Sequence, residues 1–161
     1  MERLWAPWRM EYITEEPRPG CLFCRAIENP DDKDASLVVW RPPDAIVLLN
    51  KYPYNPGHLM VVPHAHVGSL EDLDDAQAAD LMRALKRTIT VLKASLKPEG
   101  FNVGANIGRV AGAGMPDHVH LHVVPRWNGD TNFMPVLGEV KVINEHLTQT
   151  AAKLSEAFAS S

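Results

Sequence analysis

Three histidines alternate with aliphatic residues late in the chain, in a run from Asp117 to Trp127 that ends in Pro-Arg-Trp. Strict alternation of this kind predicts a strand. Side chains two apart on a strand share one face, so His118, His120 and His122 are expected to point the same way. One histidine on a strand is usually structural, whereas three in this pattern indicate a row of imidazoles that does chemistry.

The spacing of the three rings limits the chemistry that they can share. Residues four apart on a strand are separated by about 13 Å, whereas the nitrogen ligands of a zinc ion lie about 2.0–2.1 Å from it. The outer two rings are therefore too far apart to meet on one ion. An extended anionic substrate fits the row better, with one imidazole attacking and its neighbours positioning the leaving group or a metal.

Two other segments contain residue types suited to chemistry. Cys21 and Cys24 form a C-x-x-C pair, which inside a cell is either half of a zinc site or a redox pair. No βαβ pattern follows it, which disfavours redox use, and structural zinc requires two further ligands from elsewhere in the chain. A loop with Gly112 and Gly114 precedes the histidines, and backbone N–H groups of such loops bind phosphate oxygens.

The histidine run resembles the signature of the histidine triad family of nucleotide hydrolases and transferases. Asn50 and the block 52–58, Tyr-Pro-Tyr-Asn-Pro-Gly-His, are similar to a second block of that family. The matching segments span about 21–127, which is most of the chain. The arm of residues 1–20 resembles the amino-terminal segment of the diadenosine polyphosphate phosphorylase-like branch.

The resemblance implies a role for each matching residue. His120 would attack the α-phosphorus and form a covalent nucleotidyl-histidine, His122 would contact the α-phosphate or the leaving oxygen, and His118 completes the catalytic triad, with His58 supporting it from behind. The loop before the triad lacks the Gln-Ser pair of the family pattern, so mainly backbone contacts to phosphate are expected there. The predicted nucleotide-binding residues are Asn50, Asn106, Gly112, Ala113, Gly114, Met115 and His122.

The resemblance also implies a metal site. In zinc-containing members of the family, the ligands resemble Cys21, Cys24, a histidine of a Pro-x-x-His segment and the first triad histidine. Here the last two would be His66 and His118, with His64 as a rival to His66. Four protein ligands leave no position open for water, so such a zinc would be structural.

Length and composition narrow the class of protein. The chain has 161 residues, 45% of them hydrophobic, and a net charge of −4, which predicts one domain over 1–161 with 1–20 as an arm. The acidic balance argues against long nucleic acids as partners. No apolar run has the length of a signal peptide or of a membrane span, so a cytoplasmic protein without membrane contact is expected.

The elements that must position these residues follow from periodicity and turn signals. Alternating or apolar runs predict a hairpin over 37–50, a strand over 58–63 and another over 101–107. An apolar stripe predicts a long helix over 74–96, and a second stripe predicts a helix that runs to the C-terminus and leaves His146 facing solvent. The stripes are Leu81, Leu85, Ile89, Leu92 and Leu96, and Val140, Ile143, Leu147, Ala151, Leu154 and Phe158.

These elements predict an α+β fold, an antiparallel meander of about five strands with the long helix packed on it. The resemblance implies the histidine triad fold and a homodimer in which two sheets join into one. The predicted function is an enzyme, a nucleotidyl hydrolase or transferase acting on dinucleoside polyphosphates such as diadenosine tetraphosphate. Release of the nucleotide by water or by phosphate distinguishes hydrolase from phosphorylase, and the arm favours the phosphorylase-like branch.

Two alternative functions stay open. One is a nucleoside phosphoramidase of the same family, which would accept a small amine as leaving group. The other is a nucleotide-binding or zinc-stabilised interaction protein with negligible turnover, which the intact His120 disfavours.

Overall fold

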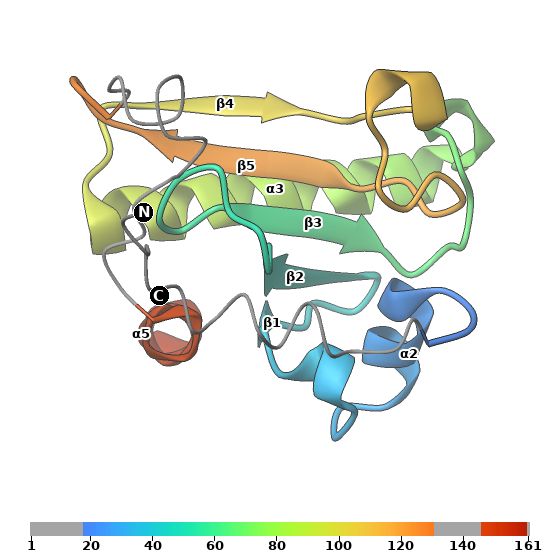
Figure 1. The fold of residues 1–161 in the computed structure, drawn as a ribbon, viewed down its shortest axis with the longest axis horizontal. Helices are drawn as coiled ribbons and strands as arrows, with labels where there is room; N and C mark the ends of the chain where they lie inside the picture. Colours follow the sequence, from blue (N-terminus) through green and yellow to red (C-terminus); the bar gives the residue numbers. More distant parts are fainter. Residues whose placement is uncertain (1–17, 131–145, 161) are drawn as a thin grey trace, which may run out of the picture.

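A five-stranded antiparallel sheet forms the centre of the computed structural model, which describes residues 18–130 and 146–160 (Figure 1). Its order, β1-β2-β3-β5-β4, confirms the α+β class but is not a simple meander, because β5 inserts between β3 and β4. The strands are β1 (Val38–Trp40), β2 (Ala45–Leu49), β3 (Leu59–Pro63), β4 (Gly100–Gly104) and β5 (Leu121–Arg126).

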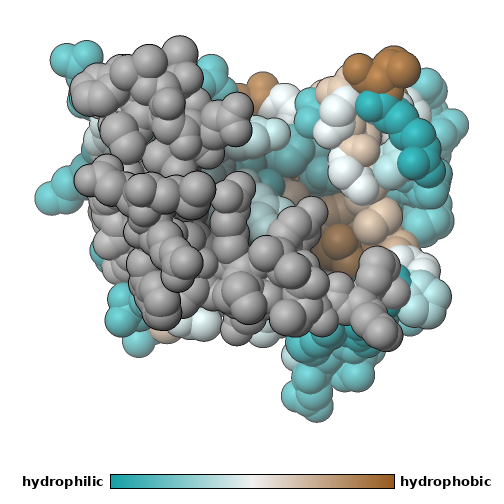
Figure 2. Space-filling view, in the orientation of Figure 1, coloured by the Kyte–Doolittle hydropathy of each residue, from teal (hydrophilic) through white to brown (hydrophobic). Residues whose placement is uncertain are grey.

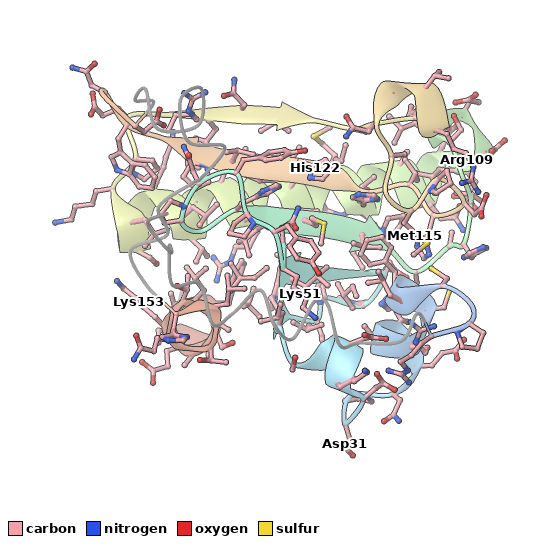
Figure 3. The ribbon with its side chains drawn as sticks, viewed as in Figure 1. Asp31, Lys51, Arg109, Met115, His122 and Lys153 are labelled. Atoms are coloured by element: carbon pink, nitrogen blue, oxygen red, sulfur yellow. The ribbon has the colours of Figure 1, made fainter. Side chains whose placement is uncertain are left out.

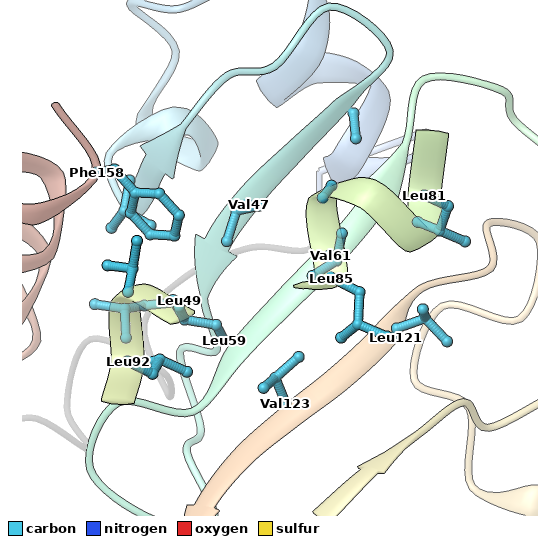
Figure 4. Packing of buried hydrophobic residues seen from close by; sticks show 14 of the residues in the cluster. Val47, Leu49, Leu59, Val61, Leu81, Leu85, Leu92, Leu121, Val123 and Phe158 are labelled. Carbon is cyan, nitrogen blue, oxygen red and sulfur yellow. The ribbon is translucent and has the colours of Figure 1, made fainter. Parts of the chain in front are cut away.

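The long helix α3 (Asp75–Leu96) covers one face of the sheet. It begins at a capping box in which Asp74 and Gln77 bond each other's backbone N–H groups, an arrangement worth about 1 kcal/mol. It ends where Lys97 adopts a left-handed conformation before Pro98. Leucines of its apolar stripe pack onto the inward-facing residues of β2, β3 and β5 (Figure 4).

The opposite face of the sheet carries a smaller apolar cluster beneath helix α2 (Leu22–Glu28). Phe23 and Ala26 of α2 pack there against Ile46 and Leu48 of β2 and Met60 of β3. Because both faces of β2 and β3 are covered, all five residues of each strand are buried, as the continuous apolar runs of these strands require. The helix also brings Cys21 and Cys24 to the edge of this cluster.

Helix α5 (Leu147–Ser160) packs against β1 and α3, where Phe158 stacks on Trp40 with ring centroids 5.1 Å apart. It confirms the predicted C-terminal helix, and His146 is exposed as expected. The predicted positions Val140 and Ile143, and residues 1–17 of the arm, lie outside the described residues. No helix in the described ranges is long and apolar enough to cross a membrane.

Two strand boundaries differ from the prediction. The strand expected over 101–107 ends at Gly104, and β5 begins only at Leu121. Pairing explains both limits, because Gly104 lies opposite His122 near the start of β5, and β3 pairs with β5 only as far as Leu121. Short 3-10 turns occupy Lys33–Ala35 (η1), Leu70–Asp72 (η2) and Arg109–Ala111 (η3).

Candidate active site

The three triad histidines divide into a pair and a single residue. The rings of His120 and His122 lie 4.8 Å apart, centroid to centroid, whereas His118 is completely buried beside the cysteines and His66. The predicted alternation is confirmed: Val119, Leu121 and Val123 pack in the core on the α3 side of the sheet, whereas His118 and His120 contact Phe23 and His122 pairs with Met60 on the α2 side. The strand itself is shorter than expected, because His118 and His120 precede β5. No strand of the described residues pairs with His118 or His120, and Val119 N–H instead donates to Val67 O.

The ring of His120 is held in one tautomer. Its Nδ1 lies 3.0 Å from the carbonyl oxygen of His118, and a carbonyl only accepts, so Nδ1 carries the proton and Nε2 keeps a lone pair. The side chain is 5% exposed, and burial lowers the pKa of His120. The ring is therefore neutral at physiological pH, which is the form that a nitrogen nucleophile requires.

His122 is the end of a directional chain of hydrogen bonds. The backbone N–H of Tyr54 donates to His58 Nδ1 over 3.0 Å, so the proton of the neutral His58 ring sits on Nε2. His58 Nε2 lies 2.9 Å from His122 Nδ1 and donates to it. His122 therefore carries its own proton on Nε2, and burial, followed by the charge of His120, lowers its pKa.

The loop between β2 and β3 is anchored at several points. Asn50 Oδ1 accepts from the N–H of Tyr52 over 2.9 Å, which is a turn-capping role for the predicted ribose ligand. The buried Asn55 donates through Nδ2 to Pro125 O over 2.9 Å and to Asp130 over 2.7 Å. Arg126 holds Asp130 in turn, with Nε 2.6 Å from Oδ2 and a second nitrogen 2.8 Å from Oδ1.

The glycine-rich loop follows the turn η3, whose Arg109 and the later Met115 are labelled in Figure 3. Gly112 N–H donates to Arg109 O, and Ala113 N–H donates to Gly108 O, so these two amides are used inside the loop. No described residue accepts from the N–H of Gly114 or Met115. Figure 2 shows hydrophobic residues at the bottom of a recess below the lobe at the upper right, where Figure 1 places this loop.

A second cluster brings Cys21, Cys24, His66 and His118 together, with one donor atom of each within 4.8 Å of the others. From His118 Nδ1, Cys21 Sγ lies 3.3 Å away, Cys24 Sγ 3.7 Å and His66 Nδ1 3.3 Å. Neighbouring donors around a tetrahedral zinc lie about 3.3–3.8 Å apart. The four residues could therefore hold one metal ion; His64 is not part of the cluster.

The protonation of the cluster suits a metal. His118 Nε2 donates to the carbonyl of Pro63 over 2.9 Å, which leaves the lone pair on Nδ1 and fixes the ring toward the sulfurs. Burial, with a smaller effect of the neighbouring Cys21, raises the pKa of the Cys24 thiol to about 11. A bound divalent metal would displace that proton, because the thiolate is the ligand.

The structure adds residues that the sequence did not single out. Phe23, between the two cysteines, packs its ring 4.9 Å from that of His120 and 5.4 Å from that of His118. The ring of Tyr54 stacks on that of His58 at 4.9 Å. Tyr54 and Phe23 both lie inside the motifs discussed above, but only their tertiary contacts indicate that they belong to the site. The Asn55–Asp130 bond joins residues 75 positions apart and leaves no local signal.

The chain belongs to the histidine triad family. The family model for the HIT domain matches residues 32–129, a range that includes His118, His120 and His122.

Named relatives and solved structures agree with this assignment. An AP-4-A phosphorylase of Mycobacterium tuberculosis is 43% identical over 99% of this chain and 85% of its own. An adenosine 5'-monophosphoramidase of Schizosaccharomyces pombe is 33% identical over 68% of this chain and 76% of its own. A zinc-bound histidine triad family protein from Mycobacterium smegmatis superposes with a TM-score of 0.70 at 25% identity, covering 87% of this chain and 94% of that one.

Proposed function

We propose that this chain is an enzyme that cleaves dinucleoside polyphosphates, such as diadenosine tetraphosphate, through a covalent nucleotidyl-histidine on His120. The observation that carries the proposal is the hydrogen bond from His120 Nδ1 to the carbonyl of His118. It leaves Nε2 as a free nucleophile beside an imidazole whose Nε2 is a donor. The similarity to an AP-4-A phosphorylase over nearly the whole chain supports this substrate class.

The first chemical step follows from the two tautomers. His120 Nε2 attacks the α-phosphorus, an N–P bond forms, and the bond to the β-phosphate oxygen breaks. The leaving nucleoside polyphosphate takes the electron pair and departs as an anion, which the Nε2–H of His122 stabilises by hydrogen bonding. The positive charge that develops on the His120 ring is shared with the His118 carbonyl through Nδ1–H.

The second step releases the nucleotide. An oxygen of inorganic phosphate attacks the same phosphorus and breaks the N–P bond, so that diadenosine tetraphosphate yields ATP in the first step and ADP in the second. Water in place of phosphate yields AMP. In the glycine-rich loop, the N–H groups of Gly114 and Met115 can donate hydrogen bonds to phosphate oxygens. Asn106 lies beside this loop and would also bind the nucleotide, and Asn50 would contact the ribose.

We further propose that the four-residue cluster binds structural zinc. The donor set of two thiols and two imidazoles matches the ligand types and tetrahedral spacing that zinc prefers. The metal, when bound, supplies a cross-link that joins α2 to the end of β3 and to His118. The zinc-bound relative from Mycobacterium smegmatis supports this choice of metal.

A homodimer in the cytoplasm completes the proposal. Within the described ranges β4 pairs on one side only, with β5. Its residues Asn102, Val103 and Gly104 are exposed, and an open strand edge is a template for pairing with a second strand. The outer edge of β4 is therefore the surface through which two sheets would join.

Product analysis tests the proposed reaction. The protein is incubated with diadenosine tetraphosphate, with and without inorganic phosphate, and the products are identified by mass. ATP with ADP in the presence of phosphate is expected for a phosphorylase, and ATP with AMP for a hydrolase. Adenosine 5'-phosphoramidate serves as the alternative substrate, because the fission yeast relative is named a monophosphoramidase. Turnover of that compound alone would contradict the proposed substrate class.

A further inference from the structure

We infer that Tyr54 recognises the leaving nucleoside polyphosphate, with its phenol as a hydrogen-bond donor to the phosphates beyond the scissile bond. The inference rests on the proposed function and deepens it, because it assigns a residue to the half of the substrate that departs. It concerns specificity between a polyphosphate and a small leaving group.

The position of the ring puts Tyr54 on the leaving-group side of the site. Its centroid lies 4.9 Å from that of His58, with the rings 28° apart, and 6.2 Å from that of His122. His122 lies between Tyr54 and His120 in this series of ring contacts, with its centroid 4.8 Å from that of His120. In the proposed reaction, His122 is the ring that contacts the leaving oxygen. Tyr54 therefore borders the path along which the chain of phosphates continues from the α-phosphorus.

The two stacked rings of Tyr54 and His58 differ in their exposure to solvent. His58 is 0% exposed, whereas Tyr54 is 55% exposed. One face of the tyrosine thus covers His58, and the rest of the ring is open to solvent. No described residue bonds its hydroxyl. A phenol O–H is a good donor to an anionic phosphate oxygen, and such charge-assisted bonds are stronger than neutral ones.

The loop that carries Tyr54 is held in place before substrate arrives. Its own N–H bonds His58, and the next residue, Asn55, is tied to Pro125 and Asp130. Gly57 has a φ of +76° and lies so close to Leu96 that a side chain at this position would collide with it. A fixed donor loses little freedom on binding, which favours its use in recognition.

The test compares two variants in two kinds of measurement. Tyr54→Phe keeps the stack on His58 and removes only the hydroxyl. Tyr52→Phe is the matched control, because Tyr52 lies in the same loop and is 54% exposed. Equilibrium binding uses AMP and a methylene-bridged, uncleavable analogue of diadenosine tetraphosphate. Turnover uses diadenosine tetraphosphate and adenosine 5'-phosphoramidate, whose leaving group has no phosphate.

Tyr54→Phe is expected to lower the affinity for the analogue about tenfold, as for loss of one hydrogen bond to a charged group. Its affinity for AMP should stay within about twofold of the wild type. It should lower kcat/KM for diadenosine tetraphosphate by a similar factor and spare the phosphoramidate, while Tyr52→Phe changes neither. Equal losses for both ligands, or none, would overturn the inference. Absence of turnover by the wild type would contradict the proposed function instead, and the binding comparison would still decide the role of Tyr54.

Discussion

At the scale of single residues, the site is defined by where the protons sit on four imidazoles. Backbone carbonyls fix His118 and His120 as Nε2–H and Nδ1–H tautomers, respectively. A backbone N–H fixes His58, which in turn fixes His122. In the proposed reaction the same residue type would therefore supply a metal ligand, a nucleophile and a hydrogen-bond donor, because each ring has a different partner.

The acid limb of the pH profile follows from His120 and His122, because the proposed reaction requires both rings to be neutral and burial lowers the pKa of both. Burial, and after it the charge of His120, lowers the pKa of His122 below the usual value of about 6.5. Protonation would place a hydrogen on Nδ1, which must accept from His58. Activity should thus be retained as pH falls to about 6.5 and be lost only below it. A profile of kcat against pH measures this midpoint, and a midpoint above 6.5 would contradict the assignment.

The sequence predicted which site residues lie together better than it predicted the contacts around them. The alternation of histidines predicted three rings on one face, and the cluster that could hold a metal contains His118 but not His122, in agreement with the distance argument. The resemblance also implied that His118 meets Cys21, Cys24 and His66, and the structure brings the four together. It did not indicate that Val67 would bond the backbone beside His118. The stacking of Tyr54 on His58 depends likewise on how the loop 50–58 closes.

At the scale of elements, the cluster of Cys21, Cys24, His66 and His118 joins three segments that are distant in the sequence. Wild-type protein is expected to contain about one zinc per chain, and Cys21→Ser and His66→Ala should lose it. His64→Ala should keep it, because His64 lies outside the cluster. Metal analysis of the purified proteins measures this, and unchanged zinc in Cys21→Ser would show that the cluster is not the site.

The close approach of the 50–58 loop to α3 predicts a stability difference between two glycines. Gly57 and Gly129 have φ values of +76° and +77°, so alanine costs about 1 kcal/mol at either position. At Gly57 the new Cβ would also press on the end of the Leu96 side chain, whereas no described residue lies within contact distance of a Cβ at Gly129. Because Leu96 must shift to make room, Gly57→Ala should lower the free energy of unfolding by about 1 kcal/mol more than Gly129→Ala.

Urea unfolding measures the two glycine variants against the wild type. Equal midpoints for Gly57→Ala and Gly129→Ala would show that the loop is not packed against α3 as described.

The elements themselves were predictable to different degrees. Helix α3 was predicted to within a residue, because its capping box, apolar stripe and terminal Pro98 are all local. The ends of β4 and β5 were not, since a strand ends where its partner does. The position of β5 between β3 and β4 is likewise set by tertiary packing, and no periodicity in the sequence indicates it.

At the scale of the whole molecule, the open edge of β4 predicts the oligomeric state. Light scattering should give the mass of a dimer for the wild type. Val103→Lys places a charge on the edge strand, where Val103 is 44% exposed, and should shift the protein to monomer. Val110→Lys is the control, because Val110 is fully exposed on η3, away from the edge strand. This variant should remain a dimer. A monomeric wild type would refute the proposed interface.

The central claim is that His120 carries the nucleotide. The most direct measurement is a denaturing quench during turnover of radiolabelled diadenosine tetraphosphate, followed by mapping of the labelled peptide. The wild type should carry an acid-labile adenylyl group on His120, and His120→Asn should carry none. This variant should bind AMP with an affinity within roughly tenfold of the wild type, and its turnover should be slower by several orders of magnitude. Label on His122, or label that persists in His120→Asn, would contradict the account.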